Sequence, residues 1–396
     1  MNRVLVLNTG SSSIKFQLFD MDDRAVLLSG QLERIGEEAS RLTWTAKGGD
    51  PVSTDERVAD HREALARIFE VLTARGGVAD QLAGIGHRVV HGGERFSAPA
   101  LIDDQVVEAI REQVPLAPLH NPANLLGIET ALATFPDTPQ VAVFDTAFHR
   151  TMPPRAHRYA LPRDLADRLG IRRYGFHGTS HAYVSRLAAA HLGKPLAELN
   201  LLTMHLGNGA SVAAVAGGRC VDTSMGFTPL EGLVMGTRSG DLDPAVVLYL
   251  QREAGMSLDQ VDELLNKQSG LKGLTGVNDM REIQRRAAAG DDAAREAFDL
   301  YCYRIRKYAG AYAAALGHLD ALVFTAGIGE HSATVRAGVC DGLQRFGVRL
   351  DPARNHLPSN RPRTVSSDDS TVAVLVVPTD EELEIAEQTL AAVRSR

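Results

Sequence analysis

The residues best suited to chemistry near the start of the chain are Asn8, the hydroxyl-rich turn 9–13 and Lys15. The apolar runs on either side of this turn predict two strands joined tightly. Backbone N–H groups in a turn of Gly and Ser can bind an anion, and a nearby lysine adds a positive charge. The segment is a candidate phosphate site, although an isolated turn of this composition more often only reverses the chain.

Two charged side chains farther along could bind a substrate or a metal ion. Arg88 lies in the segment 84–94, which is rich in glycine and histidine. Its guanidinium could hold a carboxylate in a bidentate pair, or it could form a surface ion pair with Glu94. Asp145 follows the apolar strand predicted at 141–144, at the sheet edge where α/β proteins bind ligands. It either caps a turn, which is the commoner role, or faces a metal ion.

Three more candidates come from loops and a helix start. His177 lies between an aromatic residue and a glycine, where it could face a cleft, although a lone histidine is more often structural. Arg238 belongs to the glycine-rich loop 225–244, and loops of this length without secondary structure are usually functional. Glu381 either favours a helix N-terminus or reaches a metal ion.

The set of elements that would position these residues occurs twice in the chain. Segment 201–223 repeats the order of segment 4–28, with an apolar run, a glycine-rich turn at 207–211, and two further strands joined by a second turn. This repetition predicts two similar domains facing each other across a cleft. A third glycine turn, 325–332, follows the apolar strand 322–324 and leads into a helix, an arrangement that binds phosphate or a nucleoside.

Helix signals place the remaining elements. Helices are predicted over 57–75, from Thr179 to about His191, from Asp243–Pro244 to Gly255, from Asp279, and from Asp292 to about Leu316. Asn121 is a predicted N-cap with Pro122 after it, and Thr179 another. Capping boxes are predicted for Ser257 with Gln260 and for Thr379 with Glu382.

Composition narrows the class of protein. The chain has 396 residues, 44% of them hydrophobic, which is enough for two or three domains with ordinary cores. A net charge of −7 provides no basic surface for nucleic acid. No apolar run is long enough to span a bilayer, and no signal-peptide pattern is present. The 3 widely spaced cysteines fit a reducing compartment, so we expect a cytoplasmic protein without a disulfide framework.

Phosphate-type turns in both halves, with Arg, His and Asp in a cleft, fit phosphoryl transfer, which needs positioning and positive charge more than covalent chemistry. The P-loop and protein-kinase motifs are absent from the sequence.

In these motifs the sequence resembles the acetokinase family, within the acetate and sugar kinase, Hsp70 and actin superfamily. The resemblance covers essentially the whole chain, and its segments match in order: 7–15, 86–94, 144–148, 175–181, 205–211, 236–243, 324–332 and 378–383. It implies reversible, direct in-line transfer of the ATP γ-phosphoryl group to acetate, giving acetyl phosphate and ADP. It also implies Mg²⁺, with Mn²⁺ able to substitute, and a homodimer.

The implied fold class is α/β, with two duplicated ribonuclease-H-like (actin-like ATPase) domains and a central cleft. The N-terminal lobe would comprise residues 1–149 and 383–396, with the acyl-substrate and metal residues. The C-terminal lobe would comprise residues 150–382, with the nucleotide-binding residues.

The resemblance also implies roles for individual residues. The catalytic positions are Asp145, His177 and Arg238, and the metal positions are Asn8 and Glu381. Arg88 would bind the acetate carboxylate, in an apolar pocket for the methyl group formed by Val90, Leu119, Phe176 and Pro229. The nucleotide and phosphate positions are Ser11, Ser13, Lys15, His205, Leu206, Gly207, Asn208, Gly209, Asp279, Met280, Arg281, Gly327, Ile328, Gly329, Glu330 and His331.

The expected role of Asp145 and the residue type at His331 both differ from the common family pattern. Because carboxylic acids have a pKa of about 4.3, acetate is already an anion at neutral pH, so Asp145 is expected to orient magnesium waters or Arg88 rather than to act as a base. His331 stands where many family members carry Asn, which could alter base preference or nucleotide affinity but not the transfer chemistry.

Three alternatives stay open. Val90 and Phe176 suggest a small pocket, but a propionate or butyrate kinase differs only by methylenes worth about 1–3 kcal/mol each. A nucleotide-switched clamp of the actin or Hsp70 kind would need neither Arg88 nor the apolar pocket. A sugar kinase would need a base to deprotonate a hydroxyl group.

Overall fold

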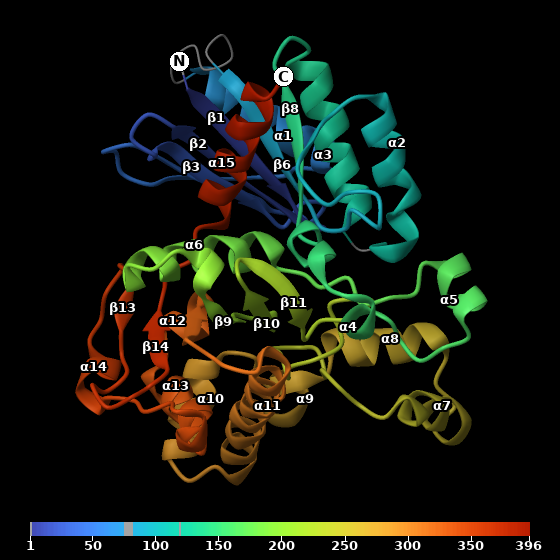
Figure 1. Ribbon diagram of the computed structural model, residues 1–396. Helices are drawn as coiled ribbons and strands as arrows, with labels where there is room; N and C mark the ends of the chain where they lie inside the picture. The colour runs from blue at the N-terminus through green and yellow to red at the C-terminus, as the bar shows by residue number, and fades with distance from the viewer. Residues whose placement is uncertain (1, 75–81, 119) are drawn as a thin grey trace. The chain divides into compact units, whose positions relative to one another are not determined.

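The computed structural model describes residues 2–74, 82–118 and 120–396. The chain divides into two compact units. Unit 1 comprises Met1–Phe148 and Asp380–Arg396, and unit 2 comprises His149–Thr379. The chain thus leaves unit 1 once and returns to it as the C-terminal helix α15, drawn in red beside the blue strands of unit 1 in Figure 1.

Unit 1 is built on a sheet with the strand order β5-β4-β3-β2-β1-β6-β8-β7. Strands β1 to β5 pair antiparallel, β1, β6 and β8 run parallel, and β7 pairs antiparallel with β8. The strands are β1 (Arg3–Thr9), β2 (Ser13–Asp20), β3 (Ala25–Glu33), β4 (Ser40–Ala46), β5 (Val52–Glu56), β6 (Leu82–Val89), β7 (Ala100–Leu101) and β8 (Gln140–Phe144).

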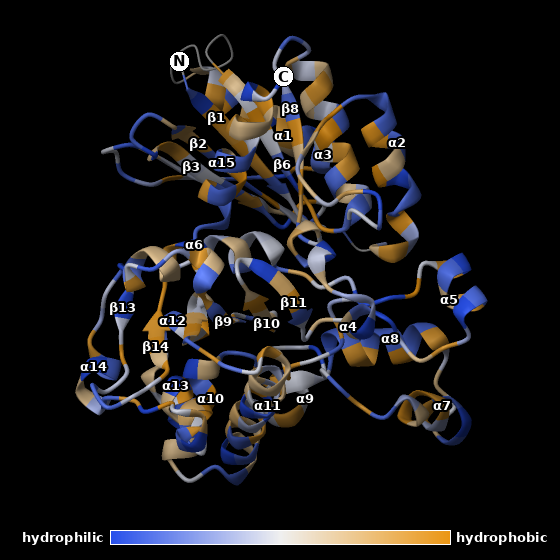
Figure 2. Cartoon of the chain, viewed as in Figure 1, coloured by the Kyte–Doolittle hydropathy of each residue, from blue (hydrophilic) through white to orange (hydrophobic). Residues whose placement is uncertain are grey.

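Both faces of this sheet are covered, so its central strands are apolar on both sides. Along β8, Val141 and Val143 pack in a cluster with residues of α15, while Ala142 and Phe144 pack in another with residues of α3. Successive side chains of a strand point to opposite faces, which explains the uninterrupted apolar run. The apolar colouring of these strands is visible in Figure 2. The run ends at Asp145, which leaves a charged side chain at the carboxyl edge.

Unit 2 contains a sheet with the order β11-β10-β9-β12-β14-β13. Its strands are β9 (Asn200–Leu206), β10 (Ala210–Ala216), β11 (Arg219–Thr223), β12 (Ala321–Thr325), β13 (Arg363–Thr364) and β14 (Ala373–Val376). Helices α6 and α11 both contact β9 and lie on opposite sides of the sheet in Figure 1.

The two sheets repeat one arrangement. The strands β3-β2-β1-β6-β8 in unit 1 and β11-β10-β9-β12-β14 in unit 2 each consist of an antiparallel meander followed by parallel strands. The predicted α/β fold with duplicated ribonuclease-H-like domains is confirmed. The hairpin of β4 and β5 was not predicted, because β5 is almost entirely exposed and lacks an apolar face to read.

The helices surround these sheets. They are α1 (His61–Ala74), α2 (Asp104–Glu112), α3 (Asn121–Thr134), α4 (Pro154–His157), α5 (Arg163–Leu169), α6 (Gly178–Leu192), α7 (Pro244–Glu253), α8 (Leu258–Lys267), α9 (Gly270–Thr275), α10 (Met280–Ala288), α11 (Asp292–Leu316), α12 (Ala326–His331), α13 (Ala333–Cys340), α14 (Pro352–His356) and α15 (Glu381–Arg394). Within the described ranges, none of them combines the length and apolar character needed to cross a bilayer.

Some predicted helix starts are confirmed. Ser257 and Gln260 form both hydrogen bonds of a capping box before α8. Asp243 and Asp279 cap α7 and α10 through their side chains. Helix α11 spans the predicted residues, whereas α1 begins at His61 rather than at residue 57. Gly76 and Gly77, whose residue type predicts the end of this helix, lie outside the described residues.

Three predicted caps are wrong. Asn121 is the first residue of α3, and its buried amide instead holds the backbone of His91. Thr179 lies inside α6, because the helix begins directly after His177. Asp380, not Thr379, caps α15, and its side chain accepts a hydrogen bond from the Leu383 N–H. A tertiary contact thus displaced the local signal at Asn121, and a neighbouring polar residue displaced it at Thr379.

Candidate active site

Arg88 and Asp145 form the centre of the site in unit 1. Strands β6 and β8 run parallel with Val89 opposite Phe144, so Arg88 near the end of β6 lies beside Asp145 just past β8. Arg88 Nη2 donates to Asp145 Oδ2 at 2.7 Å, and Nε lies 3.1 Å from the same oxygen and 3.2 Å from Oδ1. The side chain of Asp145 is only 2% exposed. Arg88 thus pairs with Asp145, and not with Glu94 as considered from the sequence.

The electrostatics keep Arg88 charged. Burial alone would lower the pKa of Arg88, but the carboxylates of Asp145 and Glu381 raise it above its ordinary value. Burial raises the pKa of Asp145, and the Arg88 guanidinium acts in the opposite direction. Arg88 Nη1 also donates to Asn8 Oδ1 at 3.4 Å. The guanidinium thus contacts oxygen atoms of Asn8 and Asp145, and the Glu381 carboxylate acts on it electrostatically.

This donor set fits a magnesium ion bound mainly through its substrate. Asn8 is the residue before the last of β1, and Glu381 is the first residue of α15. Amide and carboxylate oxygens are hard ligands, and Mg²⁺ usually takes one or two carboxylates together with water and substrate phosphates. Among the described residues, no group of three or more His, Cys, Asp or Glu side chains could hold a metal ion.

The first predicted phosphate turn joins β1 to β2. The Gly10 N–H donates to the Ser13 carbonyl at 2.8 Å, and Asn8 is paired with Lys15 across the two strands. Ser11 and Lys15 are exposed and Ser13 is half-buried. Lys15 lines a cavity of about 390 Å³ on this sheet, together with Glu382. The turn therefore presents its hydroxyl groups and its lysine to solvent.

The second phosphate turn lies in unit 2 between β9 and β10. Gly207 N–H donates to the Gly209 carbonyl at 3.0 Å, and Gly236 N–H donates to the Asn208 carbonyl at 2.9 Å. A Cβ at Gly236 would lie 2.0 Å from Asn208 Oδ1, so the glycine is required for this close approach. The loop 225–244, singled out from the sequence, thus packs directly on the turn.

His177 and Arg238 converge on Gly209. A Cβ added there would lie 3.3 Å from His177 Nε2 and 3.6 Å from Arg238 Nη1. His177 has a φ of 59°, a left-handed conformation that non-glycine residues rarely adopt and that is often found at functional sites. Burial lowers the pKa of Arg238, and no carboxylate of the described chain counteracts it. An imidazole and a guanidinium therefore meet at the phosphate turn.

A cavity of about 430 Å³ lies beside this turn. Its lining consists of Gly207, Asn208, Asn278, Asp279, Met280, Arg281, Gln284, Gly327, Ile328, His331 and Ser332. Most of these residues come from the predicted nucleotide positions, although they belong to three separate segments of the sequence. Arg281 lowers the pKa of Asp279 to about 2 through hydrogen bonds from its side chain, so this carboxylate is ionised.

Sequence reasoning missed three residues of this lining. Gln284 lies one helical turn after Met280 on α10, a spacing that could have indicated it. Asn278 precedes the cap of α10 and donates to Asn208 Oδ1 at 3.2 Å. Ser332 caps α13 and accepts from Gln284 Nε2 at 2.6 Å.

Some predicted nucleotide residues do not line the cavity. His205 is 8% exposed, and its ring stacks on that of His177 at a centroid distance of 4.2 Å. Leu206 and Gly329 are buried. The Glu330 carboxylate accepts a hydrogen bond from the Thr379 N–H at 3.1 Å. These residues lie next to the turns in sequence and contribute to the packing there, not to the cavity lining.

The four residues predicted for an apolar acyl pocket lie on different parts of the chain. Val90 follows β6 in unit 1, and its N–H donates to Asn124 Oδ1. Phe176 and Pro229 belong to unit 2, where Phe176 is 2% exposed and Pro229 is half-buried. Leu119 lies outside the described residues. Their common pocket stays a prediction.

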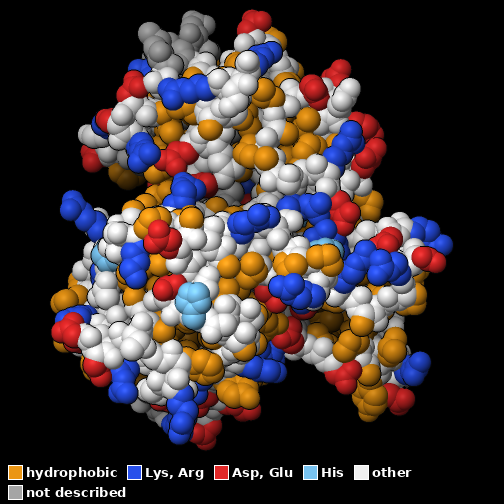
Figure 3. Space-filling view, viewed as in Figure 1, with side chains coloured by type: hydrophobic (Ala, Val, Ile, Leu, Met, Phe, Trp, Pro, Cys, Tyr) orange, Lys and Arg blue, Asp and Glu red, His pale blue; other side chains and the backbone are white. Residues whose placement is uncertain are grey.

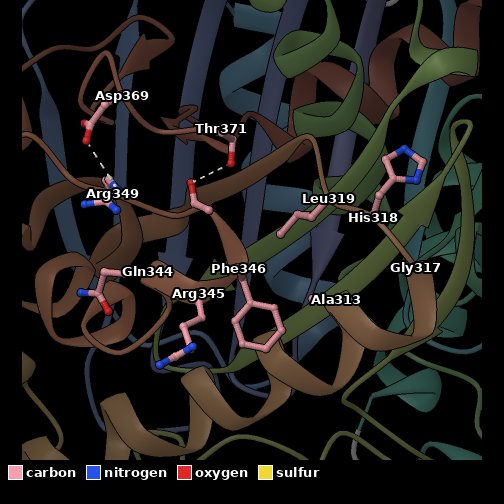
Figure 4. A pocket seen from close by; sticks show the side chains of 11 residues that line it. Ala313, Gly317, His318, Leu319, Gln344, Arg345, Phe346, Arg349, Asp369 and Thr371 are labelled. Atoms are coloured by element: carbon pink, nitrogen blue, oxygen red, sulfur yellow. Dashed lines mark hydrogen bonds and ion pairs between the residues drawn. The ribbon is translucent and has the colours of Figure 1, made fainter.

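A larger cavity of about 520 Å³ lies elsewhere in unit 2 (Figure 4). It contains none of the predicted site residues. In the view of Figure 4, the side chains of Arg349 and Asp369 point toward each other and form an ion pair at 3.5 Å. Size alone therefore does not identify the functional cavity.

Comparisons with known proteins agree on one family. A family model described as the acetokinase family matches residues 3–387. An acetate kinase of Streptomyces griseus is 60% identical over 400 residues, covering 100% of this chain and 97% of that protein. The crystal structure of Porphyromonas gingivalis acetate kinase superposes with a TM-score of 0.94 at 44% identity, covering 99% of this chain and 100% of that one. A propionate kinase from Francisella tularensis gives a TM-score of 0.94 at 41% identity, with 99% and 100% coverage.

Proposed function

The chain belongs to the acetokinase family and is a phosphotransferase, and we propose that it transfers the γ-phosphoryl group of ATP to acetate. In this reaction a carboxylate oxygen of acetate forms a bond to the γ-phosphorus. The bond from that phosphorus to the β–γ bridging oxygen breaks, and ADP leaves with the electron pair. The products are acetyl phosphate and ADP, and the reverse reaction uses the same groups.

The observation that carries this proposal is the meeting of His177 and Arg238 at Gly209. Charge in phosphoryl transfer is spread over the three equatorial oxygens of the migrating group. Fixed donors aimed at these oxygens lower the barrier because they need no reorganisation during the reaction. The Arg238 guanidinium, which no carboxylate of the described residues pairs with, and the His177 imidazole beside the same turn provide such donors.

Arg88 is suited to hold the acetate carboxylate. Of its five N–H groups, Nε and one of Nη2 are directed to Asp145, and one of Nη1 to Asn8. One N–H remains on each of Nη1 and Nη2, and these form the edge that pairs with a carboxylate in bidentate fashion. Asp145 accordingly orients Arg88, and acetate needs no base because it is already an anion.

Magnesium is the proposed metal, with Mn²⁺ able to replace it and ATP or ADP as the co-substrate. Asn8 and Glu381 would hold it through their oxygens, and the ion would neutralise charge on the nucleotide phosphates when bound. The cavity beside Met280 and Gly327 is the proposed nucleoside site. The turn with Ser11, Ser13 and Lys15 is proposed to contact phosphate.

A homodimer is part of the proposal. No residue of α7 is buried, and Val246, Leu248 and Tyr249 on it are 41%, 50% and 66% exposed. Figure 3 shows apolar side chains gathered over this helix at the lower right. An exposed apolar helix of this kind is typical of an interface. Light scattering of the wild-type protein should give twice the mass of the chain. Tyr249→Asp should give monomers, whereas the control Tyr303→Asp should remain a dimer. A monomeric wild-type protein would exclude the homodimer.

A cytoplasmic location is also proposed. Cys220, Cys302 and Cys340 are all free and buried. Burial raises the pKa of the Cys302 and Cys340 thiols to about 12, which makes them unreactive. Cell fractionation with an antibody to the chain tests the location, and recovery in the membrane or culture-medium fraction would contradict it.

The experiment that tests the function is trapping of acyl phosphate by hydroxylamine, with acetate, propionate and butyrate compared side by side. We expect Mg²⁺- and ATP-dependent acyl phosphate with acetate as the preferred acceptor. A higher kcat/KM for propionate would make the protein a propionate kinase, a relative of similar fold. ATP binding without acyl phosphate from any acid would favour a nucleotide-switched clamp instead.

A further inference from the structure

Behind His177 lies a continuous chain of hydroxyl and imidazole groups in unit 2. Thr203 Oγ1 is 2.7 Å from His181 Nδ1, and His181 Nε2 is 2.8 Å from Ser211 Oγ. The same Ser211 oxygen is 2.8 Å from His177 Nδ1. We call these four residues the hydroxyl–imidazole chain. Thr203, His181 and Ser211 are fully buried, at 0% exposure each.

The fold brings these residues together for simple geometric reasons. Thr203 and Ser211 lie on the paired strands β9 and β10, and His177 and His181 are one turn apart at the start of α6. Alternate residues of β9 point toward α6, so His205 Nδ1 likewise reaches Ser180 Oγ at 2.8 Å. Neither Ser211 nor His181 was predicted as a site residue, since both look like ordinary core polar groups.

Hydrogen counting restricts the directions of these bonds. Each hydroxyl has one hydrogen, and burial lowers the pKa of His181 well below its ordinary value, so its neutral ring also has one. If Thr203 donates to His181, then His181 donates to Ser211 and Ser211 donates to His177 Nδ1. Every hydrogen is then used in a contact of 2.8 Å or less.

The opposite direction is less favourable. His177 Nδ1 would then donate to Ser211, Ser211 to His181, and His181 to Thr203. The Thr203 hydrogen would be left with the Ala213 carbonyl at 3.5 Å, the long limit of a hydrogen bond. A second proton on His177 would impose this direction, because Nδ1 would then carry a hydrogen.

We propose that Ser211 is a positioning residue that holds neutral His177 in the tautomer with its hydrogen on Nε2, the ring nitrogen nearest Gly209. With Nδ1 committed as an acceptor, the single hydrogen of the ring points to the phosphate turn. The opposite tautomer would present a lone pair to the phosphoryl oxygens and repel them. This inference rests on the proposed function, in which His177 donates to the migrating group.

The test combines ring ¹⁵N NMR of histidine-labelled protein with steady-state kinetics. Absence of the signal in His177→Ala assigns His177. We expect wild-type His177 to be protonated on Nε2 at pH 7.5, and Ser211→Ala to show both tautomers with kcat lowered about tenfold to a hundredfold. Ser211→Thr keeps the hydroxyl and should restore kcat to within about fivefold. Ser185→Ala, which removes a buried hydroxyl that donates to the His181 carbonyl, should stay near wild type.

A pH profile separates positioning from damage to the fold. Imidazolium carries hydrogens on both nitrogens, so a protonated His177 has a hydrogen on Nε2 without help from Ser211. The kcat defect of Ser211→Ala relative to wild type should therefore shrink at least threefold between pH 7.5 and 6.0, near the ordinary histidine pKa of about 6.5. Protonation of wild-type His177 on Nδ1 would overturn the proposal, even if Ser211→Ala failed to fold. So would an unchanged tautomer in Ser211→Ala. An unchanged kcat in His177→Ala would instead remove the catalytic role of His177, and the NMR result would still decide on Ser211.

Discussion

Asp145 holds Arg88 by the Nε and Nη2 side of its guanidinium, with the shortest contact at 2.7 Å, while Nη1 donates to Asn8 Oδ1 at 3.4 Å. The two residues are brought together by the parallel pairing of β6 with β8. This relationship explains why a buried carboxylate stands beside the site although acetate requires no base.

Asp145→Asn should therefore impair acetate binding and stability together. The variant removes one partner of a buried ion pair, which typically lowers the free energy of unfolding by about 3 kcal/mol. Because Arg88 loses its orientation, KM for acetate should rise at least tenfold while KM for ATP changes less than threefold. Asp167→Asn, at an exposed ion pair of 3.0 Å with Arg158, is the matched control and should change neither. Unaltered acetate saturation in Asp145→Asn would disprove the orienting role.

Gly209→Ala should slow transfer without unfolding the protein. The added Cβ would lie 3.3 Å from His177 Nε2 and 3.6 Å from Arg238 Nη1, in the place proposed for phosphoryl oxygens. We expect kcat to fall about tenfold or more, equivalent to about 1.4 kcal/mol or more in the barrier. Gly310→Ala in α11, where the nearest atom would be 3.9 Å away, should leave kcat unchanged. Equal kcat values for the two variants would show that Gly209 does not face the reacting group.

Gln284→Ala should weaken nucleotide binding, because Gln284 lines the cavity of about 430 Å³. Loss of one polar contact is worth about 1 kcal/mol, so KM for ATP should rise about fivefold with kcat within twofold of wild type. Gln344→Ala changes the same residue type in the larger cavity of Figure 4 and serves as the control. A stronger effect from Gln344→Ala would move the nucleotide site to that cavity.

Stability should fall in mild acid because several histidines are buried in their neutral form. Burial lowers the pKa of His87, His91 and His149 to about 4, and that of His181 well below 6.5. The unfolded chain takes up protons near pH 6.5 and the folded chain does not, so stability is lost as pH falls from about 6.5 toward 4. Each group should contribute roughly 1 kcal/mol between pH 7.5 and 5.5.

Chemical denaturation at a series of pH values measures this effect. His87→Gln should reduce the pH slope of the unfolding free energy by about one proton, since the His87 ring is buried with its Nε2 2.8 Å from the neutral amide oxygen of Gln140. The exposed His356→Gln is the control and should leave the slope unchanged. A slope that is insensitive to His87→Gln would mean that this histidine is protonated in the folded protein.

The sequence was sufficient for features that depend on local pattern. The repeated meanders, the glycine-rich turns and the caps Asp243 and Ser257 follow from residue types over short stretches. Partnerships between distant residues could not be predicted, because they depend on strand register and helix packing. The contacts of Ser211 with two histidines are of this kind, whereas Arg88 was one of the two partners expected for Asp145 from the sequence. Asp380 displaced Thr379 as a cap because two neighbouring residues both had suitable side chains.

The central claim is that Arg238 stabilises the migrating phosphoryl group, and the most direct measurement is acyl phosphate formation by Arg238→Ala. A transition-state arginine contributes about 10³-fold or more, so we predict a fall in kcat of that size with KM for ATP within threefold. The charge-matched control Arg345→Ala, in the cavity of Figure 4, should retain full activity. A kcat for Arg238→Ala within tenfold of wild type would contradict the account.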